Sequence, residues 1–150
     1  MLLALLLVAP AASAESVTGR INQNRDRLFV FRASSFNQAV LTAMWKDADT
    51  DIDMIAYVID EEGEVLPLGV GVASTAHLER LEVGIGQGID IYVLLSVFSG
   101  PATSFQLNAQ STRSDEIFAG PDRMRELSDT DPRMVAGQGR LRELRGALKP

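Results

Sequence analysis

Short hydrophobic runs alternate with turn-forming residues between residues 17 and 110, at a spacing typical of β-strands. In residues 103–110, Phe105, Leu107 and Ala109 occupy every second position between polar neighbours. The same criteria predict eight strands, at residues 17–21, 27–32, 38–45, 51–60, 65–72, 77–83, 89–98 and 103–110. Strands of this length at short, regular spacing predict an all-β fold, an antiparallel β-sandwich. No window before residue 111 has sustained helical periodicity, which argues against a βαβ fold.

The pattern changes after residue 110. Residues 111–150 contain eight basic and seven acidic residues, and Phe118 is their one aromatic residue. This composition favours a largely disordered, flexible charged tail. Leu141, Leu144 and Leu148 are spaced as on a short helix, so the alternative is a basic helix that docks on a partner or on the acidic domain.

The first 14 residues carry no charge, and 12 of them are hydrophobic. An apolar run at residues 2–8 precedes Pro10 and the small residues Ala12-Ser13-Ala14, a pattern typical of a signal peptide cleaved after Ala14. The alternative is a frayed apolar N-terminus. We expect three regions: a signal peptide (1–14), a β-sandwich domain (15–110) and the tail (111–150). The mature protein is then secreted or periplasmic, and no further segment is long enough to span a membrane.

The net charge of the chain is -6, from 14 Lys and Arg and 20 Asp and Glu, and it has no cysteine. Nucleic acid is an unsuitable partner for such an acidic protein, and disulfides and thiolate zinc sites are excluded. The acidity is local: residues 15–110 hold 13 acidic and 6 basic residues, net -7, and eight of these acids lie between Asp47 and Glu64.

Asp47, Asp49, Asp51 and Asp53 place a carboxylate at every second position. In an extended segment all four project to one side, about 6 to 7 Å apart. Ca²⁺ takes oxygen ligands of this kind and would relieve their mutual repulsion, so we expect calcium as a candidate cofactor. The alternative is a solvated acidic loop that keeps the protein soluble.

Two predicted strands carry hydrophobic residues on both faces. If Asp51 and Asp53 point away from the core, the outward rows are Ile55, Tyr57 and Ile59 in one strand and Tyr92, Leu94 and Phe98 in the other. Sandwich strands normally place polar residues outward, so these rows either bind a partner or lie beneath another part of the chain. The proposed cover is the tail, through Ile117, Phe118, Met124 and Leu127.

Trp45 ends a predicted strand just before the acidic segment. Its ring is either a platform on which a sugar stacks or a core residue.

Catalytic signatures are missing from the sequence. His77 has no triad partner in its neighbourhood, and Gly84, Gly86 and Gly88 join two strands rather than lead into a helix, as a nucleotide loop would. We therefore assign no catalytic residue and expect a protein that is not an enzyme.

Several segments together resemble the bacterial pre-peptidase C-terminal domain. Residues 49–60 (DTDIDMIAYVID) followed by Gly63 resemble its Asp-x-Asp-Leu-x-Leu-x-Val-x-Asp-x-x-Gly strand and turn. Residues 88–93 (GIDIYV), 98–100 (FSG) and 104–107 (SFQL) are similar to its closing strands. The resemblance implies a jelly-roll-like sandwich without catalysis, attached to secreted bacterial enzymes or standing alone. In collagenase relatives such modules bind calcium and contact the substrate.

Three functions follow, in order of preference. The first is a non-catalytic binding or stabilising module, calcium-binding in one version, whose partner is a protein or a polysaccharide. The second is a structural or inhibitor-like partner of an exported enzyme, bound through the apolar sheet face. The third is a small hydrolase that uses paired carboxylates.

Overall fold

The computed structural model describes residues 14–32, 37–72, 77–86, 88–111 and 124–149. These residues form two antiparallel sheets and one helix. The strands are β1 (Ala14–Ile21), β2 (Arg27–Arg32), β3 (Asn37–Trp45), β4 (Asp51–Ile59), β5 (Val65–Gly71), β6 (Leu78–Ile85), β7 (Asp90–Ser99), β8 (Thr103–Ser111) and β9 (Arg125–Leu127). All eight predicted strands are present within a few residues of their expected bounds, and the all-β class is confirmed.

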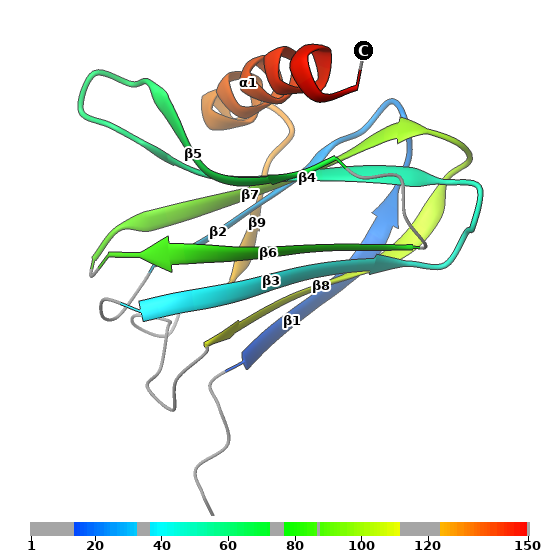
Figure 1. Cartoon of the computed structure of the whole chain (residues 1–150), viewed down its shortest axis with the longest axis horizontal. Coiled ribbons are helices and arrows are strands. Elements are labelled where there is room, and N and C mark those ends of the chain that lie inside the picture. Colours follow the sequence, from blue (N-terminus) through cyan, green and yellow to red (C-terminus); the bar gives the residue numbers. More distant parts are fainter. Residues whose placement is uncertain (1–13, 33–36, 73–76, 87, 112–123, 150) are drawn as a thin grey trace, which may run out of the picture.

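The four-stranded sheet has the order β1-β8-β3-β6, and the five-stranded sheet has the order β5-β4-β7-β2-β9 (Figure 1). Most successive strands alternate between the two sheets, and β4 and β5 form a hairpin within one of them. Two facing sheets of this order make a jelly roll, with β9 added beside β2. The predicted antiparallel, jelly-roll-like sandwich is therefore the observed fold.

The main core lies between the two sheets. Phe29 of β2 and Phe105 of β8 meet edge to face, with ring centroids 6.0 Å apart. The inward residues Thr103, Phe105, Leu107 and Ala109 of β8 are buried, and the outward residues between Ser104 and Gln110 are exposed or half-buried, as the alternating pattern of this strand predicts. Trp45, at the end of β3, also belongs to this core.

A second core lies on the outer face of the five-stranded sheet, beneath helix α1 (Pro132–Leu148) (Figure 1). Asp131 caps the helix by accepting a hydrogen bond from the backbone N–H of Arg133, 3.0 Å away, and Pro132 occupies the first helical position. Met134, Gly137 and Leu141 are the buried residues of the helix. The helix thus closes one outer face of the sandwich.

The structure differs here from the disordered tail that composition favours. Arg125–Leu127 adds a strand to the sheet, and residues 132–148 form the docked helix of the alternative interpretation. Composition misleads because only a few helical positions are hydrophobic. The apolar surface of the contact comes mainly from the sheet, and tertiary burial rather than helix propensity stabilises the helix.

Candidate functional site

The outer face of the five-stranded sheet is a continuous row of cross-strand pairs. Along β4 and β7, Asp53 lies opposite Ser96, Ile55 opposite Leu94, and Tyr57 opposite Tyr92. Helix α1 runs over this row, with Arg133 near the tyrosines at one end and Arg145 near Asp53 at the other. The predicted outward direction of Ile55, Tyr57, Tyr92 and Leu94 is correct, and all four are buried.

The two tyrosines form the polar contact at the N-terminal end of the helix. Their rings stack with centroids 5.4 Å apart, and the Tyr57 hydroxyl donates to the carbonyl oxygen of Arg133 at 2.7 Å. Arg133 in turn donates to the Tyr92 hydroxyl at 3.2 Å. Burial raises the pKa of Tyr57 well above its ordinary value. Gly137 lies directly on the Tyr57 ring, where a larger residue would collide with it.

The remaining residues of the outward rows are less covered. Ile59 is half-buried and packs against the second core, whereas Phe98 is 47% exposed. Among the residues expected to form the cover, Leu127 packs in the second core, and Met124 packs in the core between the sheets. Ile117 and Phe118 lie outside the described residues.

The acidic row divides into two parts. Asp47 and Asp49 are exposed in the loop before β4, whereas Asp51 is half-buried and Asp53 is fully buried. Lys149 Nζ lies 2.8 Å from Asp51 Oδ2 and 2.7 Å from Asp53 Oδ1. Arg145 also forms an ion pair with Asp53. Two cations from the C-terminal end of the helix region therefore neutralise Asp51 and Asp53, two of the four carboxylates for which calcium was expected.

These ion pairs are partly shielded from water. Burial lowers the pKa of Lys149, but its hydrogen bonds to Asp51 and Asp53 and their charges outweigh that effect, so its pKa lies above the ordinary value. The Lys149 ammonium also lies 4.2 Å from the centroid of the Phe98 ring. Within the described parts of the chain, no group of three or more His, Cys, Asp or Glu side chains is arranged to hold a metal ion.

Trp45 lies in the main core. Its indole N–H donates to the carbonyl oxygen of Thr50 at 2.7 Å, and only 7% of the residue is exposed. Trp45 thus packs in the main core, and it also contributes to the lining of a depression on the outer side of the four-stranded sheet.

The outer face of the four-stranded sheet has the opposite character. The outward residues of its two central strands carry no charge: Ser104, Gln106, Asn108 and Gln110 on β8, and Gln38, Val40, Thr42 and Met44 on β3. The strand register aligns them in rows across the sheet, in which Gln106 lies between Thr18 of β1 and Met44 of β3. The two central strands are thus uncharged on this face, whereas the flanking strands carry Arg20 of β1 and the exposed ion pair of Arg80 with Glu82 on β6.

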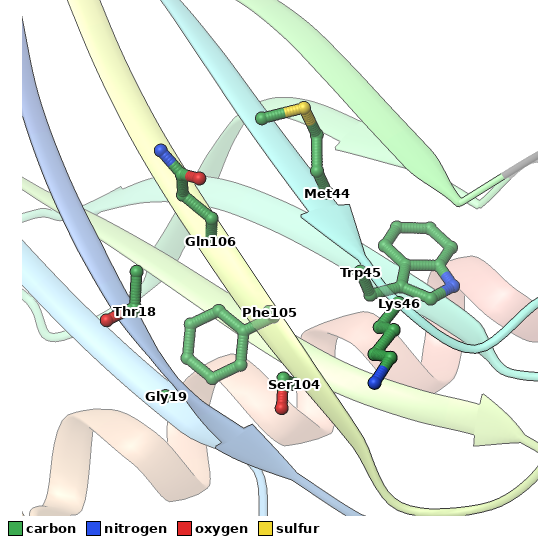
Figure 2. Close-up of a pocket in the computed structure, with 8 residues that line it drawn as sticks. All are labelled: Thr18, Gly19, Met44, Trp45, Lys46, Ser104, Phe105 and Gln106. Atoms are coloured by element: carbon green, nitrogen blue, oxygen red, sulfur yellow. The ribbon is translucent and has the colours of Figure 1, made fainter.

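A shallow depression of about 600 Å³ lies at one end of this face (Figure 2). Thr18, Ser104, Gln106 and Lys46 supply polar groups to its lining. The Gln106 side-chain amide donates to Ser16 Oγ and to Asn108 Oδ1, both at 3.0 Å, which fixes its orientation. The carbonyl oxygen of the Gln106 side chain is left to accept hydrogen bonds from a ligand.

The sequence alone does not mark Thr18, Ser104 and Gln106 as a site. The signal was the polar half of the alternation in residues 103–110, whose hydrophobic half predicts the strand. Outward polar residues are ordinary on a sandwich. They become candidate ligand contacts because α1 covers the outer face of the other sheet and leaves this one exposed.

His77 adopts a positive φ of 63° immediately before β6, and its Nδ1 lies 3.3 Å from the carbonyl oxygen of Trp45.

Among the described residues, no helix has both the length and the apolar composition needed to cross a membrane.

The two sheets and the helix on one outer face define a β-sandwich domain. No protein-family model matches the chain, and no curated protein is a significant match. A solved structure of the pre-peptidase C-terminal domain of a collagenase from Bacillus anthracis is similar, with a TM-score of 0.53 and 10% identity over 65% of this chain and 89% of that chain. The Yersinia pseudotuberculosis-derived mitogen is also similar, with a TM-score of 0.55 and 9% identity over 76% of this chain and 95% of that chain. The resemblance found in the sequence is thus confirmed at the level of the fold.

Proposed function

We propose that this β-sandwich is an exported, non-catalytic module that binds a neutral polysaccharide on the outer face of its four-stranded sheet. The observation that supports it is the difference between the two outer faces. Helix α1 closes the apolar face, whereas no described element packs over the polar face formed by β1, β8, β3 and β6.

The chemistry of the open face suits a hydroxyl-rich, uncharged polymer. Gln106, Asn108 and Ser104 offer both donors and acceptors, as sugar hydroxyls require. The absence of charge along the outward positions of β8 and β3 favours a neutral chain over an ionic one, because an ionic ligand would need a compensating charge at the centre of the site. A sheet face also suits a polymer that lies across several strands.

The other two hypotheses are less well supported. Binding of an exported enzyme through the apolar face requires α1 to leave Tyr57, Tyr92 and Leu94, which it buries. A hydrolase needs two carboxylates free to exchange protons, whereas Asp51 and Asp53 are both engaged by Lys149.

Sedimentation of the protein with insoluble cellulose, chitin, starch and mannan tests the proposal. We expect retention on at least one of these polymers, little affected by salt, and loss of retention in the Gln106→Ala/Asn108→Ala variant. The matched control is Glu61→Gln/Glu62→Gln, which alters exposed residues of the distant β4–β5 turn. Retention of the double Ala variant, or failure of the wild type to bind any of the four polymers, contradicts the proposal.

Export rests on the apolar segment at residues 2–8 and the small residues that end at Ala14. Expression of the whole chain in a Gram-negative host should yield a periplasmic protein whose mass corresponds to a start at Glu15. A cytoplasmic protein of uncleaved mass contradicts this part of the proposal.

Calcium binding by the four aspartates stays a prediction, and it requires Ca²⁺ to compete with Lys149 for Asp51 and Asp53. A rise in melting temperature at millimolar Ca²⁺ that Asp47→Asn/Asp49→Asn abolishes would support it. These two residues are exposed, so their substitution leaves the ion pairs of Lys149 intact. An unchanged melting temperature would remove calcium from the account.

A further inference from the structure

A second hollow of about 570 Å³ lies between the β4–β5 hairpin and the first half of α1, where the hairpin rises beside the helix (Figure 1). Its hydrophobic lining includes Leu66 of β5, which is 46% exposed, and Val135 of α1, which is 65% exposed. Gly139 forms part of the helical wall, and a Cβ placed there would meet no atom within 4 Å. Two exposed aliphatic residues from distant parts of the chain thus border one groove with open space beside it.

The rim of this groove is acidic. The hairpin turn carries Asp60, Glu61, Glu62 and Glu64, and the helix adds Glu143. Arg140 is the basic residue of the lining, and it is already paired with Glu143 at 2.8 Å. Within the described residues, Glu61, Glu62 and Glu64 have no ion-pair partner, so no described cation pairs with these three charges of the rim.

Asp60 has a separate, structural role. Its carboxylate oxygen accepts hydrogen bonds from the backbone N–H groups of Glu62 and Glu64, at 3.0 and 2.8 Å, and so fixes the turn. The position of the three glutamates beside the groove is therefore set by the hairpin itself. The rim is pre-organised, which lowers the entropic cost of binding a partner.

We propose that the groove between the β4–β5 hairpin and α1 docks a basic peptide segment of a partner protein, with an aliphatic side chain of that segment between Leu66 and Val135. Charge complementarity selects this occupant. A second copy of the chain would bring its own acidic rim and a net charge of -6 to the contact, so self-association at this surface is opposed by repulsion. The site is separate from the polar face, and either proposal can fail without the other.

Two glycines of the same helix provide a matched pair of variants. Gly139→Leu fills the groove, whereas Gly146→Leu adds the same side chain at a position outside the lining. A Cβ meets no atom within 4 Å at either position, and both substitutions replace glycine with a better helix former. Both variants should therefore melt at or above the temperature of the wild type.

The test is fluorescence anisotropy with a short labelled peptide of alternating Lys and Leu, and with the same peptide carrying Glu or Ser in place of Lys. We expect the Lys peptide to bind with an affinity that falls as salt is added, and the Glu peptide not to bind. Gly139→Leu should weaken binding about tenfold or more, and Gly146→Leu should leave it unchanged. Glu61→Gln/Glu62→Gln/Glu64→Gln should weaken binding and flatten its salt dependence, while Asp60 still fixes the turn.

Equal binding of the Lys peptide by Gly139→Leu and the wild type would overturn the proposal, because the attraction would then be a general effect of the acidic surface. Absence of binding by the Lys peptide, or equal binding of the Glu or Ser peptide, would also overturn it. Sedimentation velocity tests whether a second copy of the chain occupies the groove. A wild-type dimer that Gly139→Leu dissociates would assign the groove to self-association and overturn the proposal of a peptide partner. The Gln106→Ala/Asn108→Ala variant should bind the Lys peptide normally.

Discussion

The two outer faces of the sandwich both consist of every second residue of their strands, but one face is covered and the other is exposed. On the five-stranded sheet the outward row contains Ile55, Tyr57, Tyr92 and Leu94, and α1 covers it. On the four-stranded sheet the outward residues of β8 and β3 are mainly amides and hydroxyls, and no described element packs over them. The outward half of the pattern therefore decides which face is covered in the folded protein and which stays exposed.

Helix α1 is held by an apolar centre and two polar ends. Met134 and Leu141 supply the apolar contact, Arg133 meets the two tyrosines, and Arg145 reaches Asp53. Full burial of a large apolar side chain contributes about 1.5–3 kcal/mol. These contacts stabilise a helix whose own sequence, with glycine at positions 137, 139 and 146, favours helix weakly.

The largest effect is expected where the helix lies closest to the sheet. Gly137→Leu would collide with the Tyr57 ring, so the helix cannot dock without displacement. We expect a loss of about 3 kcal/mol in the free energy of unfolding by urea, together with binding of the dye ANS to the uncovered face. Gly139→Leu, two positions along the same helix, is the control. If both variants are equally stable, α1 does not close this face.

The ion pairs at the other end of the helix give the next effect. Arg145→Ala/Lys149→Ala leaves Asp53 buried without a cation, and we expect a loss of about 2–4 kcal/mol in the free energy of unfolding. Adding Asp53→Asn removes the buried charge and should recover part of that loss. A triple variant no more stable than the double variant would mean that charge is not what couples the helix to β4.

A pH titration probes both ends of the helix together. Tyr57 stays neutral in the folded protein above 10.0, its ordinary pKa, and Lys149 stays protonated above 10.5, whereas in the unfolded chain both groups lose their protons. The unfolded state is therefore favoured as the pH rises past these values, and stability should fall. Tyr57→Phe/Lys149→Met should flatten this fall, as followed by urea unfolding at successive pH values. An unchanged slope would contradict the burial of these groups.

The smallest effect is expected on the open face. Gln106→Ala removes only side-chain hydrogen bonds at an exposed site, so the free energy of unfolding should change by no more than about 0.5 kcal/mol. Leu94→Ala, on the covered face, should cost about 2–5 kcal/mol. Similar losses of unfolding free energy from the two substitutions, measured by urea unfolding, would contradict the claim that one face is buried and the other exposed.

The strands could be predicted from the sequence because each carries a local signal, either alternation, as in residues 103–110, or a short hydrophobic run between turn residues, as in β4 and β7. The parity of β4 also placed Asp53 and Tyr57 on one face. The docking of α1 could not be predicted with the same ease, since its partners are distant: Lys149 pairs with Asp53 across 96 residues. The four aspartates of the acidic row suggested a metal because their protein partners are equally distant in the sequence. Arg145 and Lys149, which neutralise Asp51 and Asp53, lie at the other end of the chain.

The most direct test of the account is a map of ligand contacts on the two faces. Amide NMR spectra of the protein would be recorded as an oligosaccharide of the retained polymer is added. We expect shifts concentrated in β8, β3 and β1, around Gln106 and Asn108, with α1 unaffected. Shifts centred on α1 and on Tyr57 and Tyr92 would contradict it, because the covered face would then be the binding surface.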